Sequence, residues 1–224
     1  MADMISSYNL LQKGLLAGIL VGFALIVLGW ILIPATNLLS ILGACIILFL
    51  YGLVYTFGLP RIHPEILHWS SVFGLIAGTI FAGEILLEYI LLPKDNTSWG
   101  LVEFGGVFFL YFLSGLWVSY RKHRVRSGIL AAALSATMSA LIWLIVVLIV
   151  FYLFRGTDRQ VQVFMAEGNY ADFARSGMTD FNTFVMEDFL GAGFFHLSIG
   201  PILALLLGAI GGFIGKMIAG IRNR

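Results

Sequence analysis

Residues 128–154 of the chain read GILAAALSATMSALIWLIVVLIVFYLF and contain no charged side chain. An α-helix rises about 1.5 Å per residue, so a run of this length can cross the roughly 30 Å hydrocarbon layer of a bilayer. Apolar and polar residues do not alternate along the run, as they would in a membrane β-strand. The segment therefore predicts a membrane-spanning helix.

Five other stretches have the same apolar character, and the composition agrees with them. The chain has 224 residues, of which 60% are hydrophobic and only 11% charged, whereas soluble domains carry roughly 25% charged residues. The six predicted spans cover residues 13–33, 37–57, 66–92, 99–120, 128–154 and 190–218. We therefore predict an all-α integral membrane protein, in which residues 1–224 form a single six-helix transmembrane domain.

Basic residues gather on one side of the predicted bundle. The side that holds both termini receives Lys13, Arg61, Arg121, Lys122, Arg124, Arg126, Lys216, Arg222 and Arg224. The opposite side receives only Lys94, Arg155, Arg159 and Arg175. Because Lys and Arg are enriched in cytoplasmic segments, we predict a cell (plasma or inner) membrane protein with both termini in the cytoplasm. The run RKHRVR at 121–126 is interpreted as an anchor at the headgroups, with a specific anionic-lipid or partner site as the alternative.

Small residues recur every four positions in several predicted helices. The series are Gly14, Gly18 and Gly22, then Gly74, Gly78 and Ala82, then Gly128, Ala132, Ala136 and Ala140. Residues four apart share a helix face, and small side chains let helix backbones approach closely. The repeat suggests three successive helical hairpins. The last span carries Gly200, Ala204, Gly208 and Gly212, with Gly211 and Gly215 on a neighbouring face. This pattern predicts contacts on two sides, within the bundle or in an oligomer.

Residues 155–189 form the only sizeable segment between spans, and we expect it to lie outside the cytoplasm. Residues 160–175 predict a short helix that ends before Gly177. Thr179 or Asp180 predicts the start of a second short amphipathic helix. Its apolar face would hold Phe181, Phe184, Val185 and Phe189. Such a helix either rests at the outer interface or covers the bundle as a lid.

No motif for a catalytic or nucleotide-binding site is present. The sequence has no P-loop, no G-x-G-x-x-G after a strand and no H-E-x-x-H. Rhomboid-type intramembrane proteases place a serine on the fourth helix and a histidine on the sixth, as Ser114 and His196 are placed here. That resemblance fails, because Phe112 stands where the G-x-S-G pattern needs glycine and the two residues lie on opposite sides of the midplane. The sequence thus favours a protein that is not an enzyme, and it leaves cofactors and metals unassigned.

Ionisable residues within the predicted spans are the most informative positions. Glu84 and Glu88 lie four apart and therefore share one face of the third helix. Glu103 lies near the start of the fourth helix, after a short loop at 93–98, and His196 lies near the outer end of the sixth. Such groups cost a few kcal/mol in a span unless they are paired or hydrated, so they usually face a cavity. The alternatives are that the glutamates reach interfacial water and that His196 is a packing residue.

These observations predict that Glu84, Glu88, Glu103 and His196 form a ligand- or cation-binding site. The predicted function is binding or translocation of a small solute or cation through an outward-facing polar cavity. The alternative is a non-catalytic accessory or scaffold subunit of a larger membrane complex. The expected partners are the lipid bilayer and either other membrane proteins or further copies of the chain, joined through Gly-rich helices. The net charge of +1 gives no reason to expect nucleic acid.

Overall fold

The computed structural model describes residues 2–91 and 97–222, with the side chains of residues 11–91 and 100–222. These residues are almost entirely helical and contain no strand. Among them, the helices long and apolar enough to span a membrane are α1 (Ala2–Leu32), α2 (Leu38–Leu53), α3 (Pro64–Leu91), α4 (Thr97–Lys122), α5 (Val125–Phe154) and α8 (Phe181–Arg222). A π-helical turn, Val54–Gly58, and a 3-10 turn, Leu59–Arg61, extend α2. The prediction of an all-α bundle is confirmed, while most of the 93–98 loop lies outside the described residues.

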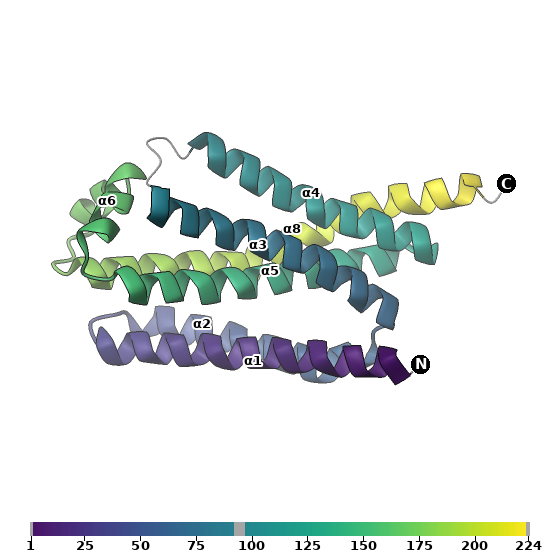
Figure 1. Ribbon diagram of the computed structural model, residues 1–224, viewed down its shortest axis with the longest axis horizontal. Helices are drawn as coiled ribbons and strands as arrows, with labels where there is room; N and C mark the ends of the chain where they lie inside the picture. Colours follow the sequence, from purple (N-terminus) through teal and green to yellow (C-terminus); the bar gives the residue numbers. More distant parts are fainter. Residues whose placement is uncertain (1, 92–96, 223–224) are drawn as a thin grey trace.

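α5 and α8 form the centre of the bundle (Figure 1). α5 is the most buried of the spans, as expected of a helix that is apolar on all sides. α8 makes extensive contacts with α4 and α5, and α3 packs along α5. The α1–α2 hairpin contacts α5 and α8 from another side, and α1 begins at the end of the bundle where α8 finishes (Figure 1).

The helix pairs expected as hairpins are all in contact, but they are not equally important. α5 packs extensively on α8, whereas α1–α2 and α3–α4 share smaller contacts. The larger contacts of the second hairpin are with other helices, namely α3 with α5 and α4 with α8. The bundle is therefore organised around its two central helices rather than as three independent hairpins.

Glycines account for the close approach of α3 to α5. A Cβ atom added at Gly74 would lie 2.9 Å from the backbone oxygen of Ser135, and one added at Gly78 would lie 2.6 Å from Cδ1 of Ile142. Both distances are shorter than any comfortable van der Waals contact. The predicted small-residue seam of this helix is thus occupied by α5. Gly14, by contrast, has nothing within 4 Å among the described residues, so the first helix is not closely packed at its start.

The small residues of α8 face two helices, as their arrangement predicted. A Cβ atom at Gly208 would meet Ala132 and Ile129 of α5, and one at Gly211 would meet the backbone of Phe112 in α4. Gly215 likewise faces α4, at Leu116. Gly200 is an exception because it meets no described atom within 4 Å. α8 is therefore wedged between α4 and α5 along its second half.

The segment before α8 differs in part from the sequence prediction. It holds two short helices, α6 (Asp158–Ala166) and α7 (Tyr170–Ser176), where one was expected over 160–175. Gly168 separates them, with a φ of +81° that favours glycine. Gly177, with a φ of +74°, ends α7 at the position where the sequence predicted a stop.

The expected second short helix is instead the first part of α8. Asp180 accepts hydrogen bonds from the backbone nitrogen and the hydroxyl of Thr183, at 2.8 and 2.6 Å, so the predicted start is correct. The helix then continues without a break to Arg222, and the span does not begin afresh at residue 190. Phe164 of α6 packs against Phe181 and Phe189, with ring centroids 5.4 and 5.9 Å apart.

Candidate functional site

A cavity lies at the end of the bundle that carries α6. It encloses about 660 Å³, including the space at its open mouth. α3 and α8 provide most of its wall, α4 and α5 contribute aromatic side chains, and α6 with the following turn contributes the remainder. The lining residues are Glu84, Ile85, Glu88, Tyr89, Phe104, Trp143, Val147, Phe164, Glu167, Asp188, Phe189, Ala192 and His196.

Three of the four residues predicted from the sequence line this cavity. Glu84 and Glu88 come from successive turns of α3, and His196 comes from α8. The structure thus brings together groups that are more than 100 positions apart in the chain.

Glu103 lies behind the cavity wall rather than on it. Its side chain is almost fully buried, at 7% exposure, and no described residue gives either carboxylate oxygen a hydrogen bond. Glu84 is its main electrostatic neighbour and Glu88 a weaker one. The carboxyl groups of Glu84 and Glu103 lie close together, but they do not form a hydrogen bond of ordinary geometry. Two neighbouring carboxyl groups in a low dielectric oppose each other's ionisation, so a proton or a cation is needed between them.

Two further carboxyl groups, Glu167 and Asp188, join the site and were not assigned to it from the sequence. Asp188, Ala192 and His196 all line the cavity and are spaced four apart, so one face of α8 carries them. That spacing was a usable signal for Asp188. Glu167 follows α6 in a turn, and no helical register could have placed it.

Glu167 shows how strongly the surroundings act on an acid here. Burial raises the pKa of its carboxyl to about 7, and the nearby Asp188 and Glu84 add to this effect. Hydrogen bonds with Glu88 and Asn169 act in the opposite direction but do not cancel it. The Asn169 amide donates to Glu167 Oε2 at 3.0 Å. Glu167 therefore exchanges its proton near neutral pH.

No lysine or arginine is among the described residues that line the cavity. Arg159 belongs to α6, which contributes to the cavity wall. Its Nε donates to the carbonyl oxygen of Tyr89 at 2.6 Å, and its Nη2 donates to that of Ile90. It thus satisfies backbone carbonyls at the end of α3. Arg175 pairs with Asp172 in α7.

The Tyr89 hydroxyl is a second buried polar group at the cavity. Tyr89 is only 3% exposed, and its hydroxyl has no hydrogen-bond partner among the described residues. A buried hydroxyl without a partner costs roughly 1–3 kcal/mol. Its position in the wall means that a polar ligand or water within the cavity is the natural partner.

His196 is enclosed by aromatic rings. Its ring stacks on Trp143 at 4.3 Å between centroids and lies 5.0 Å from Phe81 in an edge contact. Phe104 stacks at 6.0 Å. These contacts fix the imidazole at the inner end of the wall. Ser114 is elsewhere: its hydroxyl lies 3.1 Å from that of Ser135 in the α4–α5 contact. Ser114 therefore engages another serine, in line with the rejected resemblance to rhomboid-type proteases.

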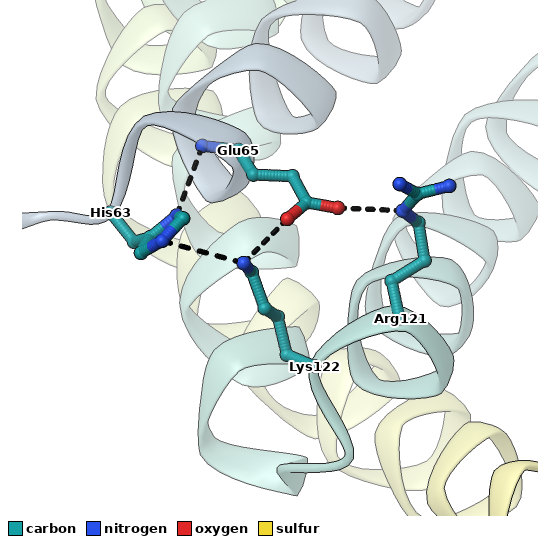
Figure 2. Close-up of polar contacts among 4 residues, drawn as sticks. All are labelled: His63, Glu65, Arg121 and Lys122. Carbon is teal, nitrogen blue, oxygen red and sulfur yellow. Dashed lines mark hydrogen bonds and ion pairs between the residues drawn. The ribbon is translucent and has the colours of Figure 1, made fainter.

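A separate charged cluster ties the start of α3 to the end of α4 (Figure 2). Glu65 accepts from Arg121 Nε at 2.6 Å and from Lys122 Nζ at 2.5 Å. His63 Nδ1 accepts from the backbone nitrogen of Glu65 at 3.2 Å, and its Nε2 lies 3.4 Å from Lys122 Nζ. Two residues of the 121–126 basic run are thus engaged within the protein. We interpret the cluster as a clamp between helices.

No group of three or more His, Cys, Asp or Glu side chains within the described residues has the arrangement of a metal site. Searches against protein families, curated proteins and solved structures find no match. Any functional assignment therefore depends on the cavity and its chemistry.

Proposed function

We propose that this multi-pass membrane protein binds or translocates a small cationic solute through the acidic cavity. The observation that carries the proposal is the concentration of carboxyl groups around a cavity lined by no lysine or arginine of the described chain. Glu103 adds a buried carboxyl behind the wall, and Tyr89 adds a hydroxyl without a partner. A bound cation or proton would relieve the repulsion among these groups.

We further propose that the cavity opens on the outer face of the cell membrane. By their positions in the sequence, nine of the thirteen basic residues belong to the side of both termini. α1 begins and α8 finishes at the end of the bundle opposite to α6 (Figure 1). Cytoplasmic segments are enriched in Lys and Arg. In this orientation the acidic mouth would attract cations from outside the cell.

The proposal is tested by thermal unfolding of the purified protein in mild detergent, with and without cations at constant ionic strength. A ligand at about 100 times its Kd stabilises the folded state by roughly 2.7 kcal/mol. Glu84→Gln should melt at a higher temperature than the parent without ligand, because it removes one repelling charge, and should show a smaller cation-dependent increase. Glu65→Gln is the control, because Glu65 lies in the clamp at the other end. If no cation and no pH change shifts the melting temperature, the proposal is wrong.

One observation favours the alternative of an accessory or scaffold subunit. A Cβ atom added at Gly100, Gly105 or Gly106 of α4 would meet no described atom within 4 Å, and small residues let a neighbouring helix approach closely. A partner helix would fit against them. Stable co-purification of another membrane protein, lost in Gly105→Leu but retained in Gly52→Leu, would support this function.

A further inference from the structure

The carboxyl groups of the cavity fall into two levels. Tyr89, near the mouth, interacts electrostatically with Glu167, Glu88 and Asp188. Deeper in the wall, Glu103 interacts mainly with Glu84. Glu84 and Glu88 are one turn apart on α3, which is about 6 Å along the helix axis. The site thus offers an outer and an inner anionic group separated by roughly one helical turn.

The rest of the cavity lining is largely aromatic and aliphatic. Phe104, Trp143, Phe164 and Phe189 contribute rings, and Ile85 and Val147 contribute branched side chains. Aromatic faces attract ammonium groups, and this attraction strengthens when the cation has lost its water. Methylene groups bind well to such a wall, whereas a hydrated metal ion gains little from it.

The described residues also lack the ligand arrangement that an inorganic ion would need. No cluster of three metal-ligating side chains is present among them. The Tyr89 hydroxyl, buried and without a partner, is an acceptor for one N–H group of a ligand. Ammonium groups present three donors each, which suits carboxylates and a hydroxyl that surround them from different helices.

From this arrangement, and building on the proposed cation-binding function, we infer that the ligand class is a short linear diamine. One ammonium group would lie among Glu88, Glu167 and Asp188, and the other would lie beside Glu84. The methylene chain between them would cross the aromatic wall. A diamine would neutralise both levels at once, which a monoamine of the same length cannot do.

The test compares putrescine, n-butylamine and magnesium chloride with the full-length protein in detergent at pH 8 and constant ionic strength. Binding is followed by the melting temperature and by tryptophan fluorescence, because Trp143 lines the cavity. Putrescine should bind at least about tenfold more tightly than n-butylamine, the ratio that corresponds to 1.4 kcal/mol. Magnesium should produce no saturable change.

Two variants test the two-level arrangement. Glu84→Gln should reduce putrescine affinity about tenfold, to that of n-butylamine. Tyr89→Phe keeps the ring and removes only the hydroxyl, so it should weaken putrescine binding without changing the melting temperature of the free protein by more than a few degrees. Glu65→Gln should bind putrescine as the parent does.

The outcomes separate this inference from the proposed function. Equal affinities for putrescine and n-butylamine, or saturable binding of magnesium with comparable strength, would overturn the diamine assignment and leave cation binding intact. A protein that responds to none of these cations would overturn both. Retained putrescine affinity in Glu84→Gln would show that the inner level does not hold an ammonium group.

Discussion

Replacing Gly115 with alanine should loosen the central crossing of α4 and α8. A Cβ atom at this position would lie 2.7 Å from Cα of Gly208 and 2.8 Å from its carbonyl oxygen. Comfortable contact between carbon atoms begins at about 3.5 Å, so the two helices would have to separate by nearly 1 Å. Both contacted atoms belong to the backbone, and no side-chain rotation can relieve the overlap.

The size of the effect follows from two opposing contributions. Overpacking of this kind costs typically 1–3 kcal/mol. Alanine is favoured over glycine in a helix by roughly 1 kcal/mol. Gly105→Ala on the same helix is the matched control, because a Cβ atom there would meet no described atom within 4 Å. The difference in unfolding free energy between the two variants should therefore be about 1–3 kcal/mol and should isolate the packing cost.

Thermal or denaturant-induced unfolding in the same detergent, followed by circular dichroism, gives the comparison. The parent should fall between the two variants or close to Gly115→Ala. If Gly115→Ala unfolds at or above the temperature of Gly105→Ala, the close crossing of α4 and α8 is wrong.

Three other predictions follow from the described contacts. Glu65→Gln should destabilise the protein by no more than about 1 kcal/mol, and by less at high salt, because its ion pairs are partly exposed; a loss of several kcal/mol would show that the clamp is a main determinant of the fold. The folded-state pKa of Glu167 is about 7, above its ordinary value of 4.5, so its contribution to stability should be lost as pH rises from about 4.5 to about 7. Glu167→Gln should flatten that part of the stability profile, and an unchanged profile would contradict the assignment. In a Cys45→Ser background, Ser176→Cys should react with an impermeant thiol reagent on intact cells, whereas Ser127→Cys should react only after permeabilisation; the reverse result would invert the proposed orientation.

The spans could be predicted from composition because the bilayer imposes a length and an apolar character on each helix. The start of α8 could not be predicted in this way. Residues before 190 are helical because Phe181 and Phe189 pack on Phe164 of α6, a contact between distant parts of the chain. A hydropathy profile of the sequence does not reveal such a contact.

In the site, too, the features set by helical spacing could be predicted from the sequence, and those set by contacts between distant elements could not. The spacing of Glu84 and Glu88 on one face could be read from helical periodicity, and both residues line the cavity. Glu103 lies beside Glu84, as expected, but it is buried and does not line the cavity. Glu167 enters the site through the turn after α6, and only the folded arrangement of α6 against α3 brings it there.

The distribution of glycines along α4 fits the place where this cavity forms in the bundle. Where α4 crosses α8, Gly115 and Gly208 bring the two backbones together, so no space remains between them. Towards α6, α4 diverges from α5 and α8 (Figure 1), and Gly105 and Gly106 of this part of α4 touch no described atom. The crossing therefore holds α4 close to α8. Beyond it α4 diverges from α5 and α8, and large aromatic side chains fill only part of the space there. If α4 moves when a ligand binds, the rotation should occur about this crossing. Gly115→Ala should then alter cation affinity as well as stability, whereas Gly105→Ala should leave the Kd for the cation within about twofold of the parent. Equal ligand affinities in the two variants would show that the cavity is shaped independently of the crossing.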